Sequence, residues 1–110
     1  MTCERYDIVV VPFPFADRRA SKRRPALVLS SQRFNAESGN SVLAMVTSAS
    51  NPPWPMDVLI DAAHAGLQAP SKVRMKLFSL DNRLILRRAG NLSQADRRAV
   101  AATIQRLLAA

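Results

Sequence analysis

Hydrophobic positions along the chain fall into short runs separated by turn-forming residues, a pattern typical of a small β-rich domain. The first run, Ile8 to Val11, is apolar and β-branched, and Phe13 and Phe15 then alternate with two prolines. A proline has no backbone N–H to donate, so sheets tolerate it at their edges. We therefore predict a buried strand whose far end lies at a sheet edge.

Short elements of the same kind continue through the first half of the chain. A glycine after a helical turn and prolines in a loop are common signals that regular structure ends. The pattern predicts a basic loop over Asp17–Arg24, a strand over Ala26–Ser30 opened by Pro25, a helical turn over Ser31–Gly39, a strand over Ser41–Ser48, a loop over Asn51–Pro55 and a short strand over Met56–Ile60.

The second half begins with the clearest strand of the chain, Lys72 to Phe78. Three apolar residues alternate there with Lys72, Arg74 and Lys76, so one face is expected to enter the core. The other face would then present three cations in a row. A further strand is predicted over Arg83–Arg88, ended by Gly90 and Asn91.

The C-terminal segment has the periodicity of a helix. Ser93 and Asp96 stand three residues apart, close to a capping box. Val100, Ile104, Leu107 and Leu108 follow on one helical face. Five or six short strands and a packing helix predict a mainly β fold with peripheral helices, built as a small barrel or strongly bent sheet.

Composition agrees with one folded domain over residues 1–110, because 48% of the residues are hydrophobic. The longest apolar stretch is too short to span a bilayer, and the first residues do not form a signal peptide, so no membrane association is expected. A single cysteine, Cys3, cannot form an internal disulfide. A reducing cytoplasm is the simplest location.

Charge narrows the class of partner. Lys and Arg number 16 against 8 Asp and Glu, which gives a net charge of +8, and 13 of the 16 are arginines. The bases concentrate in residues 1–24 and 71–98, with a mildly acidic segment between them. A small basic domain rich in arginine typically binds a polyanion or an acidic protein, although such charge can also serve solubility alone.

Most catalytic chemistries find no support in the sequence. The pattern contains no metal-ligand spacing and no glycine-rich phosphate loop. Cys3 and His64 could formally pair as nucleophile and base, but Cys3 lies in a terminus expected to be mobile. His64 is better explained as a histidine without a role. Trp54, beside three prolines, could stack on a nucleobase or anchor its loop.

The strongest candidate site combines Ser21-Lys22-Arg23-Arg24-Pro25 with Val46-Thr47-Ser48. Five of the seven residues from Arg18 to Arg24 are cationic, although such runs are often only a solvated loop. Arg24 precedes the proline of one predicted strand, and Thr47 ends another. A cation and a hydroxyl held at neighbouring strand ends can clamp an anion.

These same residues carry a resemblance to a known family. Asp7-Ile-Val-Val-Val-Pro-Phe-Pro-Phe15, Lys22-Arg-Arg-Pro-Ala-Leu-Val-Leu-Ser30 and Met45-Val-Thr-Ser48 together resemble the MazF/PemK family of toxin endoribonucleases. The later family pattern is matched by Trp54-Pro-Met-Asp-Val58, Ala65-Gly-Leu67 and Ser71-Lys-Val-Arg74, and more loosely by Leu84-Ile-Leu-Arg87 and Gly90-Asn-Leu-Ser93. The match therefore covers nearly the whole chain. Family members usually carry glycine where this chain has Tyr6.

The resemblance implies an SH3-like barrel, a homodimer and cleavage of single-stranded RNA without metal or other cofactor. It implies that Arg24 and Thr47 form the catalytic pair, and that an antitoxin with an acidic, disordered segment covers the groove. In such cleavage the 2′-hydroxyl attacks the adjacent phosphate, and each hydrogen-bond donor to the transition state is worth about 3 kcal/mol. The residues expected to bind RNA are Arg18, Arg19, Ser21, Lys22, Arg23, Ser48, Trp54, Lys72, Arg74 and Lys76.

Two alternatives remain open at this point. A binding module on the same barrel would hold nucleic acid or an antitoxin without cutting, with an affinity that falls steeply with salt. A toxin directed at gyrase is a third reading, because such toxins share this barrel. It would not need the Arg24 and Thr47 pair, and fold alone does not decide between these functions.

Overall fold

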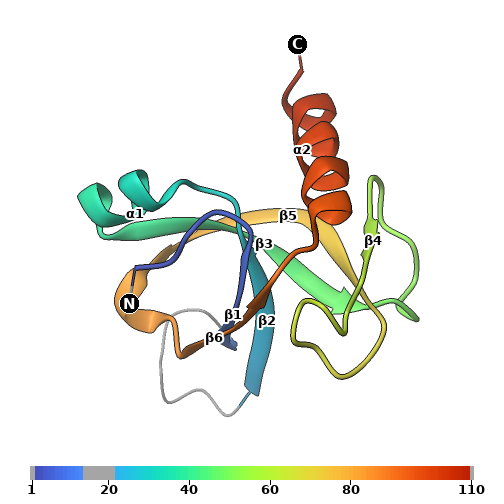
Figure 1. Cartoon of the computed structure of the whole chain (residues 1–110), viewed down its shortest axis with the longest axis horizontal. Helices are drawn as coiled ribbons and strands as arrows, with labels where there is room; N and C mark the ends of the chain where they lie inside the picture. The colour runs from blue at the N-terminus through green and yellow to red at the C-terminus, as the bar shows by residue number, and fades with distance from the viewer. Residues whose placement is uncertain (1, 14–21, 110) are drawn as a thin grey trace.

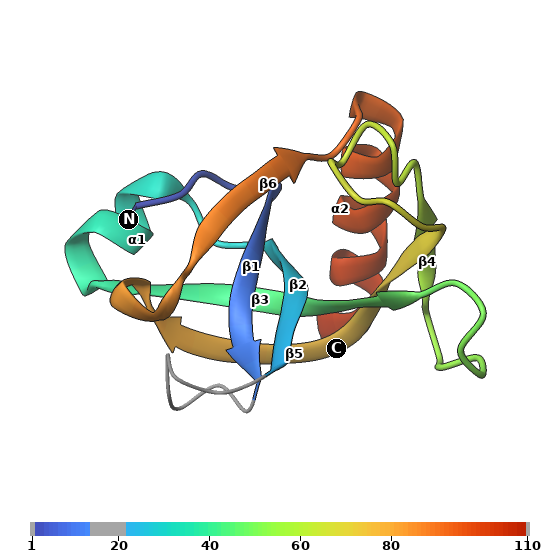
Figure 2. The same cartoon turned by 90° about the horizontal axis from the view of Figure 1, so that it is seen from below.

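The computed structural model describes residues 2–13 and 22–109. Its centre is a curled antiparallel sheet with the strand order β4-β5-β3-β2-β1-β6 (Figures 1 and 2). The predicted mainly β fold with a C-terminal helix is confirmed. The elements are β1 Asp7–Phe13, β2 Lys22–Val28, α1 Gln32–Ser38, β3 Asn40–Ser48, β4 Val58–Ile60, β5 Ser71–Asp81, the 3-10 turn η1 Asn82–Leu84, β6 Arg87–Asn91 and α2 Gln94–Leu108.

Both faces of the central strands are buried, which explains the unbroken apolar run at the start of the chain. Val9 and Val11 enter one hydrophobic cluster with Val28 and Leu43. Ile8, which alternates with them, enters a second cluster on the other face. The strand alternates as any strand does, but both directions lead into a core.

The two predicted helices form with the predicted caps. The Ser31 hydroxyl accepts from the backbone N–H of Phe34 at 3.2 Å, and α1 ends at Gly39, whose φ of 74° favours glycine. The Ser93 hydroxyl accepts from the backbone N–H of Asp96, also at 3.2 Å. The Asp96 carboxylate in turn accepts from the backbone N–H of Asp61 at 2.8 Å, which fastens the segment after β4 to α2.

The expected apolar face of α2 is correct for its first half only. Val100 is fully buried and Ile104 is half-buried. Leu107 and Leu108 lie beyond the sheet, at 36% and 71% exposure, where α2 projects from the body of the molecule (Figure 1).

Two predicted strand boundaries are wrong. β2 begins at Lys22, so the cationic residues before Pro25 belong to the strand and not to a loop. Pairing of β2 with β3 starts only at Ala26, which leaves the proline where one neighbour is absent from the ladder. The predicted strand 83–88 is instead η1 followed by β6, and Ile85 turns into the core between them. Asp81 caps η1 by accepting from the backbone N–H of Arg83 at 2.8 Å.

Tyr6 shows why glycine is usual at its position. Its φ is 75°, a left-handed conformation that costs a residue with a side chain about 1–2 kcal/mol. The ring is flanked by the guanidinium carbons of Arg5 and Arg97, at 4.7 and 5.5 Å from its centroid. The backbone N–H of Tyr6 donates to Val28, at the end of β2 opposite to Arg24. This departure from the family pattern therefore lies away from the candidate site.

Candidate active site

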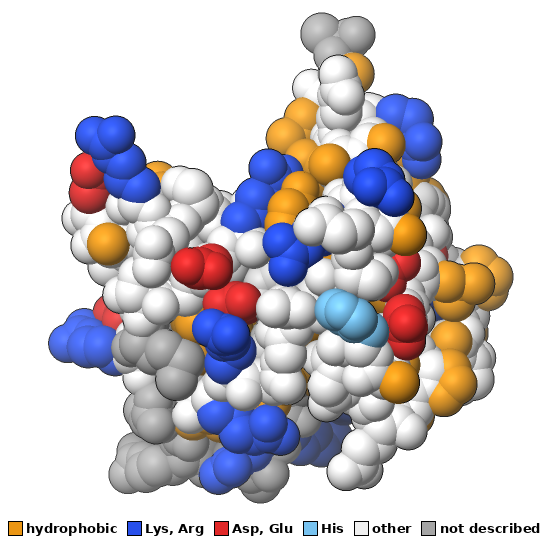
Figure 3. Space-filling view, viewed as in Figure 1, with side chains coloured by type: hydrophobic (Ala, Val, Ile, Leu, Met, Phe, Trp, Pro, Cys, Tyr) orange, Lys and Arg blue, Asp and Glu red, His pale blue; other side chains and the backbone are white. Residues whose placement is uncertain are grey.

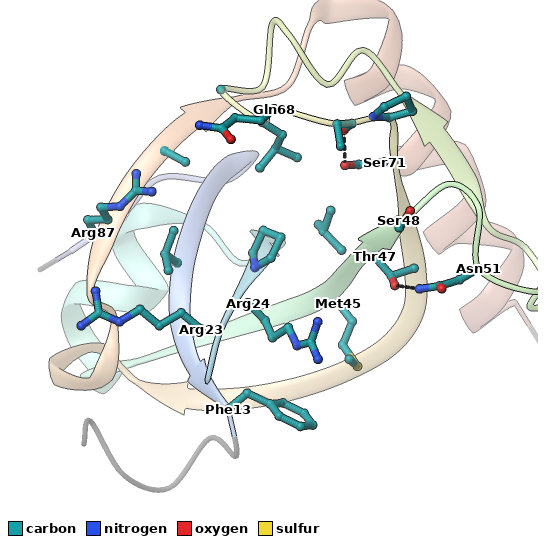
Figure 4. A pocket seen from close by; sticks show the side chains of 18 residues that line it. Phe13, Arg23, Arg24, Met45, Thr47, Ser48, Asn51, Gln68, Ser71 and Arg87 are labelled. Carbon is teal, nitrogen blue, oxygen red and sulfur yellow. Dashed lines mark hydrogen bonds between the residues drawn. The ribbon is translucent and has the colours of Figure 1, made fainter. Parts of the chain in front are cut away.

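An open cavity of about 840 Å³ lies where β2 begins and β3 ends, beneath the loop that precedes β5 (Figure 4). Its principal polar and aromatic lining residues are Phe13, Arg23, Arg24, Thr47, Ser48, Asn51, Gln68, Ser71 and Arg87. Two separated parts of the sequence, the cationic start of β2 and the hydroxyl-bearing end of β3, thus share one cavity, as the sequence predicts.

Arg24 and Thr47 lie just beyond the point where β2 and β3 stop pairing. The last pair of the antiparallel ladder on this side is Ala26 with Met45. Beyond that pair, Arg24 and Thr47 both line the cavity. The Arg24 guanidinium carbon stands 5.4 Å from the centre of the Phe13 ring, and the side chain extends toward Met45 and Thr47 (Figure 4).

The Thr47 hydroxyl has a partner that the sequence did not single out. The Asn51 side-chain amide donates to Thr47 Oγ1 at 2.5 Å. The neighbouring Ser48 hydroxyl is engaged with the Ser50 hydroxyl at 2.9 Å. The sequence gives no signal for Asn51, because it lies in a proline-rich loop. Only the folded loop brings its amide to Thr47, four residues earlier at the end of β3.

Arg23 and Arg87 stand at the other end of the cavity from Thr47 (Figure 4). β1 separates their strands, with Pro12 paired to Arg23 and Val10 paired to Arg87. Because Val10 and Pro12 are two residues apart, the two arginines lie on one face of the sheet. Sequence reasoning missed Arg87, since the consecutive pair Arg87-Arg88 gives no sign of which one faces the site.

Arg88 points to the opposite face. Its guanidinium lies 3.7 Å from the carboxylate of Asp7, which is itself buried. Side chains alternate along β6, so Arg87 lines the cavity while Arg88 pairs with Asp7 on the other face. Lys and Arg side chains gather on the surface where β1 and β2 end (Figure 3).

The expectation that Lys72, Arg74 and Lys76 face outward in a row is wrong. Ala44 pairs with Leu77, yet the next residue, Met45, pairs with Arg74, so a bulge interrupts the alternation of β5. Lys72 is buried and only Lys76 of the three cations is exposed.

Asp57 holds the two inner cations. Its Oδ2 lies 3.3 Å from Lys72 Nζ and 3.1 Å from Arg74 Nη2. Arg74 also donates to the backbone oxygen of Pro52 at 2.7 Å, and Lys72 donates to that of Asn51 at 2.7 Å. Both cations therefore fasten the loop that carries Asn51.

Asp57 remains ionised in this setting. Burial acts to raise its pKa, but hydrogen bonds from Arg74, from the Trp54 backbone N–H and from Lys72 outweigh burial and lower the pKa below its usual value. The charged carboxylate is thus the stable form between its two cations at neutral pH.

Trp54 and Lys76 lie outside the residues that line the cavity. The Lys76 ammonium stands 4.4 Å from the centre of the Trp54 ring, and Arg74 stands 5.8 Å from it. The indole lies against both cations and is 41% exposed. Lys22 is exposed at the start of β2, and Arg18, Arg19 and Ser21 lie outside the described residues.

Glycine contacts shape the wall of the cavity opposite Arg24. A Cβ at Gly66 would stand 2.2 Å from the carbonyl oxygen of Ala89, and one at Gly90 would stand 2.5 Å from that of Ala65. The loop therefore lies directly on β6. This close approach sets the position of Gln68, which faces the cavity from that loop (Figure 4).

Cys3 and His64 have local roles. Cys3 is 2% exposed within the first hydrophobic cluster. The expectation that Cys3 lies in a mobile segment is therefore wrong. Burial and the nearby Asp7 raise the pKa of its thiol. His64 Nδ1 lies 3.1 Å from the backbone oxygen of Asn91.

Over residues 2–13 and 22–109, no three His, Cys, Asp or Glu side chains lie close enough together to hold a metal ion. No helix in those same ranges is long and apolar enough to cross a membrane.

The chain matches known proteins over nearly its whole length. The family model "PemK-like, MazF-like toxin of type II toxin-antitoxin system" matches residues 4–108. Endoribonuclease MazF9 of Mycobacterium tuberculosis is 33% identical over 89 residues, which cover 76% of this chain and 75% of the relative.

Solved structures agree on the fold. A MazE-MazF structure from Deinococcus radiodurans superposes with a TM-score of 0.78 at 24% identity, over 99% of this chain and 97% of that chain. An endoribonuclease in complex with its cognate antitoxin, from Mycobacterial species, superposes with a TM-score of 0.77 at 14% identity, over 97% and 93% of the two chains. The resemblance stated from the sequence is thereby confirmed, and the chain belongs to the PemK-like, MazF-like family of toxins from type II toxin–antitoxin systems.

Proposed function

We propose that this toxin is a metal-independent endoribonuclease that cuts single-stranded mRNA at selected sequences and so arrests translation. The observation that carries the proposal is the shared cavity of Arg24 and Thr47, which offers a cation and a hydroxyl to one anionic group. The relative MazF9 is named an endoribonuclease, which supports the same activity.

Cleavage would proceed within the RNA itself. The 2′-hydroxyl gives its proton to water and attacks the adjacent phosphorus, and the bond to the 5′ oxygen breaks as that oxygen takes a proton from water. A 2′,3′-cyclic phosphate and a 5′-hydroxyl end result. Arg24 would stabilise the charge on the phosphorane with its two-point fork, and Thr47 would donate to a non-bridging oxygen.

Flanking phosphates would lie along the remaining cations of this surface. Arg23 and Arg87 face the cavity without an acidic partner among the described residues, which makes them the best placed for a neighbouring phosphate. Lys22 and Ser48 adjoin them at the two strand ends. Trp54 and Lys76 would contact RNA that leaves the cavity, with Lys72 and Arg74 supporting the loop that carries Trp54. Arg18, Arg19 and Ser21 remain proposed RNA contacts.

A cognate antitoxin would occupy the same cationic cavity with an acidic, disordered segment. The surplus of arginine there suits a chain of carboxylates as well as a chain of phosphates. Relatives have been crystallised as MazE-MazF complexes, which supports such a partner. We further propose a homodimer acting in the cytoplasm. Exposed Leu59 and Leu108, at 70% and 71%, offer apolar surface for a second copy.

The chemistry of the product ends tests this function. RNA incubated with the protein should carry 5′-hydroxyl ends that a polynucleotide kinase labels without prior phosphatase treatment. Fragments with 5′-phosphate ends would refute attack by the 2′-hydroxyl. RNA that binds but stays intact would favour a binding module, and inhibition of gyrase without RNA cleavage would favour the protein-directed reading.

A further inference from the structure

Asn51 is held rigidly beside Thr47. Its backbone N–H donates to the carbonyl of Ser48 at 3.1 Å, and its carbonyl accepts from Lys72 Nζ at 2.7 Å. Lys72 is in turn paired with Asp57. The side-chain amide of Asn51 stands beside Thr47 with its N–H donating to Oγ1.

This contact has a consequence for the hydroxyl proton. A threonine hydroxyl carries one proton and two acceptor lone pairs. The amide of Asn51 takes one lone pair, and within residues 2–13 and 22–109 the proton has no acceptor. Thr47 lines the cavity, so rotation of its hydroxyl can direct the proton into the space that Arg24 also faces.

We propose that Asn51 is a positioning residue that fixes Thr47 as a hydrogen-bond donor toward the phosphate of the substrate. The inference rests on the proposed function and adds to it the residue that sets the direction of the catalytic hydrogen bond. With the Asn51 amide on one lone pair, the hydroxyl keeps its own proton to donate to the phosphate and one further lone pair. A carboxylate in the same place would reverse this direction, because it can only accept.

That reversal supplies the decisive variant. Asn51→Asp is nearly isosteric, but its carboxylate would take the Thr47 proton and turn it away from the cavity. We expect Asn51→Asp to lower kcat about 100-fold, the cost of one lost donor in such a site, as Thr47→Val should. Asn51→Ala frees the hydroxyl to rotate without redirecting it, and about a 5–10-fold loss is expected, since only the preorganisation is lost.

A double-mutant cycle separates positioning from general damage to the loop. In the Thr47→Val background, Asn51→Asp and Asn51→Ala should lower kcat by less than about 2-fold further, because the bond they act through is already gone. Multiplicative losses in the double variants would overturn the inference. So would an Asn51→Asp enzyme with wild-type kcat, since the amide would then be accepting from Thr47.

A matched control accounts for the added negative charge. Ser50 is the exposed neighbour of Asn51 and does not contact Thr47. Ser50→Asp should raise KM as the RNA is repelled, but it should leave kcat within about 3-fold of wild type. An equal fall in kcat for Ser50→Asp and Asn51→Asp would assign the effect to charge and refute positioning.

Binding of RNA that cannot be cut keeps the inference apart from the proposed function. The same variants are titrated with a 2′-O-methyl version of the RNA, which lacks the attacking hydroxyl. If the double variant at positions 47 and 51 loses no more affinity than the weaker-binding single variant, the result supports the oriented donor, even if wild type cuts no RNA. Additive losses in binding refute it, whatever becomes of the nuclease activity.

Discussion

Asp57 and Lys72 form an ion pair, with 3.3 Å between Oδ2 and Nζ, in which only 13% and 7% of the two side chains are exposed. They stand fifteen positions apart in the sequence, and their contact closes the proline-rich loop onto β5. Lys72 also donates a hydrogen bond to the backbone carbonyl of Asn51. The ion pair therefore helps to hold Asn51 in place beside Thr47. Lys72, which the sequence predicts to be an exposed RNA contact, is instead buried and holds the loop beside the candidate site.

Removal of the Asp57 charge should destabilise the protein. A buried charge left without its partner costs about 3–5 kcal/mol, and because the loop can open to hydrate Lys72, we expect Asp57→Asn to lose about 2 kcal/mol. Urea unfolding at neutral pH measures this loss. Glu37→Gln is the matched control, because the Glu37 pair with Arg33 is exposed and should matter far less.

Acid provides an independent check on the same pair. The folded-state pKa of Asp57 lies below its unfolded value, so the stability from its charge is present above the ordinary aspartate range and is lost as pH falls through the folded pKa. The stability gap between wild type and Asp57→Asn should therefore narrow in acid. A gap that widens as pH falls would contradict the assigned charge state.

A methyl group at Gly66 should displace the loop wall of the cavity. Gly66 has a φ of 79°, and a Cβ there would lie 2.2 Å from the Ala89 carbonyl oxygen. Gly39 has a φ of 74° with nothing within 4 Å of its Cβ position. Gly39→Ala should cost about 1 kcal/mol from backbone strain alone, and Gly66→Ala at least about 1 kcal/mol more. Equal unfolding energies for the two variants would show that the loop does not rest on β6.

Tyr6 should reverse the usual ranking of alanine and glycine. At a residue with negative φ alanine is usually the more stable of the two, but the positive φ of Tyr6 favours glycine by about 1 kcal/mol. Tyr6→Gly should therefore unfold at higher urea than Tyr6→Ala, while both lose the contacts of the ring with Arg5 and Arg97. Because Tyr6 lies far from Arg24, both variants should keep wild-type kcat. A lower midpoint for Tyr6→Gly would disprove the strained backbone.

Arg87 and Arg88 should differ in their effect on RNA affinity. Arg87 lines the cavity, whereas Arg88 faces Asp7 on the other side of β6. Arg87→Glu should weaken binding of a 2′-O-methyl RNA about 10-fold or more at low salt. The slope of log affinity against log salt concentration should fall by about one released counterion. Arg88→Glu adds the same charge beside Asp7 and should mainly reduce stability. Equal losses of affinity would mean that net charge, and not the cavity, binds the RNA.

The sequence predicts most elements because their patterns are local. The run Ile8 to Val11, the caps at Ser31 and Ser93 and the strand after Ser71 all follow from neighbouring residues. The assignment of Lys72 and Arg74 failed because their partner, Asp57, lies on another element and a bulge shifts the register of β5. Arg24 and Thr47 were predicted to lie together from their places at strand ends, and both line the cavity. The places of Asn51 and Arg87 in that cavity follow only from the folded loop and from the face of β6.

Cleavage of a long single-stranded RNA in EDTA tests the central claim most directly. Wild type should give discrete fragments, and Arg24→Ala and Thr47→Ala should each slow their appearance at least about 100-fold. Arg33→Ala, which alters an exposed arginine on α1, should cut as wild type does. Intact RNA with wild-type protein, or fragments that persist unchanged in the Arg24 and Thr47 variants, would contradict the account.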